Sequence, residues 1–247
     1  IKKNKFAEMM TLYGRQTVLE ILRDYSLLIY RLHLAKTNKV TAVMEEIEDL
    51  AKERKIEICY HDKSALSRIS KNGRQDQGVA IDIKSNKYRN ISQLGDTEGD
   101  LIGLDNVTNP QNLGMVIRSV AASPLNGLLL PRKGCAKIDP LVHKASAGTL
   151  FKTNIYHTAT LEHGLRLLKS SDFELIALVG SSHTSISDIP SRSERSRIFL
   201  LGNESIGLRD NIRQLCDFEI SIPMANQVES INVAAAATLV AFRQSFG

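Results

Sequence analysis

Cysteine is scarce in this sequence, and its three copies form no recognisable pattern. Cys59, Cys135 and Cys216 lie far apart, and none belongs to a CxxC pair. This spacing argues against a disulfide scaffold and favours a reducing, cytoplasmic compartment. The six histidines show no HExxH or other ligand spacing, so the sequence predicts no metal site.

Long apolar runs are also missing. The longest largely apolar run, Val233 to Phe242, is far shorter than the roughly 20 residues that a membrane helix needs. Residues 1–10 contain no apolar segment of signal-peptide length, so we expect neither export nor contact with a membrane. With 43% hydrophobic and 24% charged residues, the 247-residue chain has the composition of a soluble globular protein and suits two domains.

Three widespread ligand-binding or catalytic loops are absent. No GxGxxG follows the first strand, and neither GxxxxGK[ST] nor GxSxG occurs. Their absence argues against a Rossmann dinucleotide site, a P-loop for nucleoside triphosphates and the nucleophile elbow of the α/β-hydrolases.

Charge is distributed unevenly along the chain. Residues 1–95 hold 18 Lys and Arg against 12 Asp and Glu, a net charge of +6, whereas residues 96–247 hold 14 against 15. A basic excess in one half is typical of a module that binds a polyanion such as RNA. A solvated basic surface without a partner explains the charge equally well.

Hydrophobic periodicity predicts a small α/β unit over residues 1–84. Helices are expected over 13–25, 40–55 and 65–69, and strands over 27–35, 56–60 and 79–83. We interpret the polar stretch 71–78 as a surface loop in preference to a phosphate or base contact. Residues 85–99 are polar, contain glycine and lack periodicity, which predicts a linker.

Residues 100–247 alternate between strand and helix patterns. Strands are expected over 101–107, 127–131, 153–157, 174–180, 197–202 and 218–223, and helices over 112–123, 139–147, 161–171, 206–215 and 231–245. Because most of these strands are continuously apolar, the pattern predicts an α/β domain with a parallel sheet covered on both faces.

Three of these strands end in clusters of polar residues. The clusters contain Asn112 with Arg118, Gly202 with Glu204, and Ser230 with Asn232. Strand ends in α/β sheets leave a crevice, and helix N-termini offer free N–H groups, so such junctions commonly bind ligands. Three junctions of this kind predict one composite site.

Each residue of these clusters also has an ordinary interpretation. Arg118 has apolar neighbours in sequence, so we expect it to be buried and to need an anionic partner, with a bound phosphate or carboxylate favoured over a structural ion pair. The asparagines and Ser230 can act as helix caps, and Glu204 can complement a helix dipole. Gly202 can serve a tight turn.

Taken together, three motifs resemble those of the SpoU (TrmH-type) RNA ribose 2'-O-methyltransferases of the SPOUT superfamily. They are NxGxxxR (Asn112, Gly114, Arg118), LGNExxG (201–207) and IPMxxxVESxNV (222–233), in the family's order over about residues 98–247. The segments YGRQTV (13–18) and DQGVA (76–80) resemble the ends of the ribosomal-protein-like RNA-binding domain of members that act on large-subunit rRNA.

The resemblance implies a fold and a set of site residues. It implies a small α/β RNA-binding domain at 1–84, a linker at 85–99 and a SPOUT methyltransferase domain at 100–247, which ends in a trefoil knot and forms a homodimer. S-adenosylmethionine would be held in the knot by Gly180, Gly202, Ile222, Met224 and Ile231. The catalytic or RNA-contacting positions would be Asn112, Arg118, Glu204, Ser230 and Asn232.

One position departs from the family pattern. Asn226 stands where the family commonly has glycine in its third motif. Asparagine tolerates left-handed backbone angles better than most residues, so we expect the loop to keep its shape.

The sequence therefore predicts an S-adenosylmethionine-dependent enzyme that methylates a ribose 2'-hydroxyl in large-subunit rRNA, without a metal. Two alternatives stay open, a tRNA ribose 2'-O-methyltransferase and a non-catalytic RNA-binding factor of ribosome assembly. Two roles also stay open for Arg118, the base that removes the hydroxyl proton or a group that positions phosphate and hydroxyl.

Overall fold

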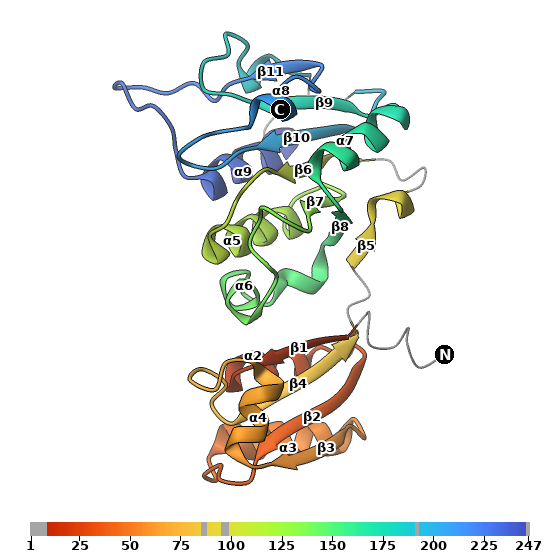
Figure 1. Cartoon of the computed structure of the whole chain (residues 1–247), viewed down its shortest axis with the longest axis vertical. Coiled ribbons are helices and arrows are strands. Elements are labelled where there is room, and N and C mark those ends of the chain that lie inside the picture. The colour runs from red at the N-terminus through yellow and green to blue at the C-terminus, as the bar shows by residue number, and fades with distance from the viewer. Residues whose placement is uncertain (1–8, 85–87, 95–98, 191–192, 246–247) are drawn as a thin grey trace. The chain divides into compact units, whose positions relative to one another are not determined.

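The computed structural model describes residues 9–84, 88–94, 99–190 and 193–245. The chain divides into two compact units, residues 1–86 and residues 87–247 (Figure 1). In the part of the chain that is described, no helix is both long enough and apolar enough to cross a membrane. The cytoplasmic location stays a prediction.

The first unit is a four-stranded mixed sheet with strand order β1-β4-β2-β3. Strands β2 and β3 are parallel, and β4 is antiparallel to both β1 and β2. Its elements are β1 (Met9–Tyr13), α2 (Arg15–Arg23), β2 (Ile29–Ala35), α3 (Ala42–Glu53), β3 (Glu57–His61), α4 (Lys63–Ser70) and β4 (Val79–Lys84). The predicted helices and strands are thus confirmed to within a few residues, and β1 is an additional strand.

Strand β1 was not predicted, and it displaces the start of the first helix. Tyr13, the expected first residue of that helix, is the last residue of β1 and pairs with Ala80 of β4. Gly14 has φ 95°, a left-handed angle that glycine adopts without strain, and it turns the chain from strand into helix α2.

The second unit is a seven-stranded sheet with order β11-β9-β10-β6-β7-β8-β5. Each of its strand pairings is parallel, which confirms the predicted parallel sheet. The strands are β5 (Tyr88–Asn90), β6 (Leu101–Leu104), β7 (Gly127–Pro131), β8 (Asn154–Thr158), β9 (Glu174–Leu178), β10 (Arg197–Leu201) and β11 (Phe218–Ile220). Every residue of β6 and β10 is buried, as expected for strands covered on both faces.

In the described residues of the second unit, five α-helices connect or follow these strands. They are α5 (Pro110–Ala121), α6 (Pro140–Ala145), α7 (Leu161–Ser170), α8 (Asp210–Arg213) and α9 (Val233–Phe242). Helix α9 packs against α5 and against β10 at the centre of the sheet (Figure 1). The trefoil knot implied by the resemblance stays a prediction.

Residues 88–94 differ from the predicted linker. Strand β5 pairs in parallel with β8, and the 3-10 turn η1 (Ile91–Gln93) follows it. Ile91 and Leu94 are buried in the core of the second unit. A three-residue edge strand is too short to show a period of two, which is why the pattern indicated a linker. Residues 85–87 and 95–98 lie outside the described residues.

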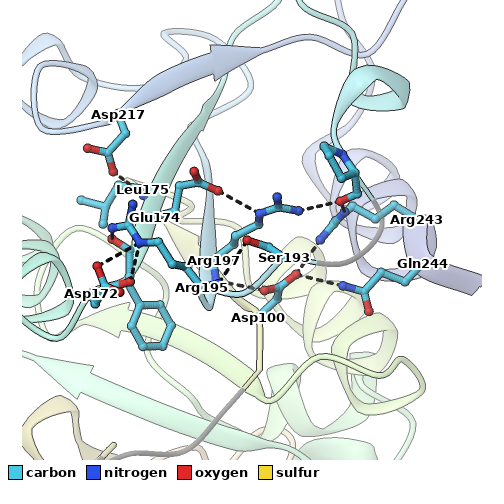
Figure 2. Close-up of polar contacts among 12 residues, drawn as sticks. Asp100, Asp172, Glu174, Leu175, Ser193, Arg195, Arg197, Asp217, Arg243 and Gln244 are labelled. Atoms are coloured by element: carbon cyan, nitrogen blue, oxygen red, sulfur yellow. Dashed lines mark hydrogen bonds and ion pairs between the residues drawn. The ribbon is translucent and has the colours of Figure 1, made fainter.

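Buried charged side chains connect the segment after α9 with residues at the start of β6, β9 and β10 (Figure 2). Asp100, directly before β6, accepts hydrogen bonds from Arg243 Nη2 at 2.5 Å and from the backbone N–H of Arg197 at 2.9 Å. Arg197 pairs with Glu174 at 2.9 Å, and both arginines donate to the carbonyl of Pro190. The side chains of Arg197 and Arg243 are only 6% and 7% exposed. This network fixes the segment that follows α9.

Candidate functional site

The segments that follow β9, β10 and β11 line a cavity of about 320 Å³ in the second unit. The residues predicted to hold a cofactor all contribute to its lining, namely Gly180, Gly202, Ile222, Met224 and Ile231. Glu204 and Ser230 line it as well. This volume lies at the lower end of the roughly 300–1,000 Å³ that small-molecule sites span, and the cavity lies at the strand ends where α/β proteins bind ligands.

The second motif forms one wall of the cavity as a tight turn, which two backbone hydrogen bonds between Asn203 and Gly207 close. The N–H of Asn203 donates to the carbonyl of Gly207 at 3.1 Å, and the N–H of Gly207 donates back to Asn203 at 2.8 Å. A Cβ atom on Gly202 would lie 2.1 Å from the carbonyl carbon of Gly207. Gly202 therefore permits a close approach within the chain's own backbone.

The loop of the third motif has the backbone conformation expected for its unusual residue. Asn226 has φ 55° and Gln227 has φ 59°, both in the left-handed region. The expectation that Asn226 serves in place of glycine is confirmed for the backbone. At the end of the loop, Asn232 caps α9, because its Oδ1 accepts the N–H of Ala234 at 2.8 Å.

Asn112 connects the three junctions. Its side-chain N–H donates to Glu204 Oε1, and its Oδ1 accepts from Asn232 Nδ2 at 3.1 Å. Asn112 is buried and is not the cap of α5, since Asn109 caps that helix by accepting the N–H of Gln111 at 2.8 Å. The predicted convergence of the junctions is confirmed by these contacts.

An ion pair between a buried carboxylate and a half-exposed arginine, which was not predicted from the sequence, links the same loops. Asp105, directly after β6, is fully buried and accepts hydrogen bonds from Arg209 Nη2 at 2.6 Å and from the Arg209 backbone N–H at 3.1 Å. The hydrogen bond to Asp105 raises the pKa of Arg209. Asn203 Nδ2 also donates to the carbonyl of Asn106 at 3.0 Å. A carboxylate directly after a continuous apolar strand was the signal available in the sequence.

Arg118 is exposed, so the prediction of burial is wrong. The residues of α5 that face the core are Asn112, Leu113, Gly114, Val116, Ile117 and Val120. Arg118 shares the exposed face with Gln111 and Met115, because residues three or four apart lie on one side of a helix and immediate neighbours do not. Within the described ranges the Arg118 side chain makes no hydrogen bond or ion pair, and Arg118 does not line the cavity.

A second cavity, of about 550 Å³, lies within the first unit. Three basic residues line it, Arg15, Lys63 and Arg74, against one acidic residue, Asp76, and Gln77 and Gly78 line it as well. The backbone N–H of Arg15 donates to Gln77 Oε1 at 3.0 Å, and Arg15 Nε donates to the Gln77 carbonyl at 3.2 Å. The loop 71–78 therefore forms part of a basic cavity, as the alternative interpretation of a phosphate or base contact requires.

Two family models match the chain. The model of the SpoU rRNA methylase family matches residues 101–242, which hold the cavity and its loops. The chain belongs to the SpoU rRNA methylase family. A second model, described as RNA 2'-O ribose methyltransferase substrate binding, matches residues 11–89. The family predicted from three short motifs is confirmed.

Relatives of this SpoU family member include mycobacterial proteins. It is 30% identical over 233 residues to an uncharacterized tRNA/rRNA methyltransferase of Mycolicibacterium gilvum. The matched residues make up 92% of this chain and 73% of that protein. It is 29% identical over 238 residues to an uncharacterized tRNA/rRNA methyltransferase of Mycobacterium leprae, covering 94% and 76%.

Solved structures of SpoU and rRNA methyltransferases share its fold. The SpoU methyltransferase AviRb of Streptomyces viridochromogenes, in complex with AdoMet, matches with a TM-score of 0.77 and 20% identity over 98% of this chain and 91% of that one. The AdoMet-bound rRNA methyltransferase of Sinorhizobium meliloti matches with a TM-score of 0.73 and 21% identity over 98% and 89%. The predicted architecture, a parallel-sheet α/β domain preceded by a small α/β domain, is confirmed.

Proposed function

We propose that this SpoU family member transfers a methyl group from S-adenosylmethionine to a ribose 2'-hydroxyl of large-subunit rRNA. The observation that carries the proposal is the cavity of about 320 Å³ lined by the loops of the second and third motifs. Asn112 of the first motif is hydrogen-bonded to both of those loops. Helix α5 also carries an exposed arginine of the first motif, Arg118, which does not line the cavity.

The lining of this cavity suits S-adenosylmethionine. Ile222, Met224 and Ile231 offer apolar surface, and the loop backbones offer hydrogen-bonding groups. A Cβ atom at Gly180 would meet only the Glu229 carbonyl, at 3.6 Å, so this wall is open to a ligand. When bound, S-adenosylmethionine supplies an electrophilic methyl group on a sulfonium.

The polar residues around the cavity position loops and substrate. Asn112 holds Glu204 and Asn232, so these residues fix the three loops against one another, and Ser230 on the cavity wall orients the ribose. A guanidinium normally stays protonated, so we assign Arg118 to gripping a phosphate of the RNA and polarising the 2'-hydroxyl. In favourable cases, positioning of this kind lowers the activation free energy of a reaction by on the order of 7–11 kcal/mol.

The first unit supplies the contact with RNA in this proposal. Its cavity lined by Arg15, Lys63 and Arg74 suits phosphate groups, and residues 1–95 hold the basic excess of the chain. We therefore assign RNA recognition to residues 1–84 and methyl transfer to residues 100–247.

A methylation assay tests the proposed reaction. With tritiated S-adenosylmethionine, we expect incorporation into unmodified large-subunit rRNA and recovery of the label as a 2'-O-methylated nucleotide after nuclease digestion. The Gly202→Val variant is the control without a cofactor cavity, because its side chain would collide with the backbone of Gly207.

Each alternative has its own outcome in this assay. Incorporation into tRNA alone would favour a tRNA ribose methyltransferase, and label on a base would contradict ribose methylation. RNA binding without cofactor binding, measured by calorimetry, would favour a non-catalytic assembly factor.

We further propose that the second unit forms a homodimer through the outer face of α5 and α9. Met115 and Leu239 are 50% and 49% exposed, although both are large and apolar. On the same two helices, Ser119 Oγ and Thr238 Oγ1 are 2.7 Å apart and form a hydrogen bond between α5 and α9. An exposed apolar face on a pair of packed helices is typical of a protein interface.

Substitution of Leu239 tests the homodimer. Sedimentation equilibrium is expected to show a dimer for the natural chain and a dissociation constant raised at least about tenfold by Leu239→Asp, since a charge would be buried in the interface. Val40→Asp is the matched control, because Val40 is 80% exposed in the first unit. A natural chain that sediments as a monomer, or a Leu239→Asp variant that dimerises normally, would exclude this interface.

A further inference from the structure

Two histidines and a cysteine lie together on one face of the sheet of the first unit. His33 of β2 pairs with Cys59 of β3, and His61 follows Cys59 by two residues. Because side chains along a strand alternate between faces, Cys59 and His61 project on the same side. One donor atom from each of the three residues, two imidazole nitrogens and one sulfur, lies within 4.8 Å of the others.

We propose that His33, Cys59 and His61 bind one zinc ion. Imidazole nitrogen and thiolate sulfur are the donors that zinc prefers, and a set containing sulfur disfavours Mg²⁺ and Ca²⁺. The fourth position of a tetrahedral site falls to water or to Glu57, whose Oε1 lies 3.6 Å from Cys59 Sγ.

A buried carboxylate orients the first ligand. Asp82 Oδ2 lies 3.0 Å from His33 Nε2, and Thr11 Oγ1 donates to Asp82 Oδ1 at 2.6 Å. His33 and Asp82 are 4% and 5% exposed. Histidine ligands in metal sites almost always donate their second ring N–H to such a group, which fixes the tautomer. With Nε2–H donating to Asp82, Nδ1 of His33 presents its lone pair to the cluster.

Metal binding requires a defined change in protons. In the structure, His33 Nδ1 and His61 Nε2 are 2.9 Å apart and share one hydrogen bond. Zinc takes the place of that proton, His61 then carries its proton on Nδ1, and the thiol proton of Cys59 is released to solvent. The competing explanation is a chain of hydrogen bonds from His61 through His33 and Asp82 to Thr11, without an ion.

The position of the cluster indicates a structural role for the ion. Among the described strands, β3 is at the edge of the sheet and pairs only with β2. An ion bound by His33 of β2 and by Cys59 and His61 of β3 would stabilise the pairing of the edge strand with β2. The absence of a histidine motif led the sequence analysis to predict no metal, because these ligands come from two strands that are distant in sequence.

Titration of the 247-residue chain with metal tests the site. After removal of metal with a chelator, the protein is titrated with ZnCl₂ against a chromophoric chelator and separately with CoCl₂. We expect one equivalent to bind, with a thiolate-to-cobalt charge-transfer band in the cobalt form. Cys59→Ser and His61→Ala are expected to weaken zinc binding at least about tenfold, and Asp82→Asn by about 10–100-fold.

The other two cysteines provide matched controls. Cys135 and Cys216 are partly buried like Cys59 but lie in the second unit, so Cys135→Ser and Cys216→Ser should bind zinc as the natural chain does. Circular dichroism establishes that the variants are folded, and zinc should raise the unfolding temperature of the natural chain but not of Cys59→Ser. The proposal is overturned if the natural chain takes up no stoichiometric zinc, if Cys59→Ser binds it equally well, or if the cobalt form lacks the thiolate band.

Discussion

Arg118→Ala is expected to lower the rate of methyl transfer by about 100- to 1,000-fold, the range measured when one donor to a developing charge is removed. The affinity for S-adenosylmethionine should stay nearly unchanged, because Arg118 is exposed on α5 and does not line the cavity. Single-turnover methylation measures the first quantity and titration calorimetry measures the second.

Two further variants sharpen this prediction. Arg166→Ala is the control, since Arg166 is an exposed arginine of the same unit that pairs with Glu162 on its own helix, and its rate should stay near that of the natural chain. Arg118→Lys keeps the charge but loses the planar fork that grips a phosphate, so an intermediate rate is expected. Full turnover by Arg118→Ala, or a large loss of cofactor affinity, would show that the role of Arg118 is misassigned.

Mixing two inactive variants shows which cavity Arg118 serves. If the proposed homodimer completes each site across its interface, a mixed dimer of Arg118→Ala and Gly202→Val chains contains one intact site. Random mixing of equal amounts in a two-fold symmetric dimer then restores about a quarter of the sites. No restored activity would place Arg118 in the site of its own chain.

The parallel sheet of the second unit was predictable because its central strands are continuously apolar. Covered strands such as Phe199 to Leu201 leave no polar alternation, and helices must then pack on both faces. The meeting of the three junctions followed from the same reasoning, since the carboxyl ends of parallel strands share one edge. Neither inference needed side-chain detail.

Features that depend on the azimuth of a side chain or on long-range pairing were missed. Arg118 was expected to be buried because its sequence neighbours are apolar, yet a helix turns those neighbours to another face. Asp105 is paired with Arg209, which lies far along the chain, and sequence spacing does not reveal this ion pair. Strand β5 is stabilised by its backbone pairing with β8, and a pattern of three residues does not predict this pairing.

Arg243→Met is expected to lower the free energy of unfolding of the second unit by about 3–5 kcal/mol, the usual cost of leaving one partner of a buried ion pair alone. Arg243 and Asp100, whose ion pair is drawn in Figure 2, have side chains 7% and 10% exposed. The Arg243 guanidinium lies 4.6 Å from the centre of the Phe199 ring. Methionine keeps much of the apolar stem, so the loss reports mainly on the charge. Hydrogen exchange of the β6 and α9 amides in increasing denaturant measures this free energy.

The unpaired carboxylate, and not the lost packing, is the expected source of that effect. Asp100→Asn in the Arg243→Met background should recover part of the stability, because it removes the uncompensated charge. The recovery is only partial, since the single amide oxygen can accept from Gln244 Nε2 or from the Arg197 backbone N–H but not from both. Arg166→Met is the control for an exposed ion pair, and it is expected to lower the free energy of unfolding by about 0.3–0.5 kcal/mol. Equal losses for Arg243→Met and Arg166→Met would mean that water reaches Asp100 freely. The ion pair between Arg243 and Asp100 would then contribute no more to anchoring the end of α9 than an exposed pair does.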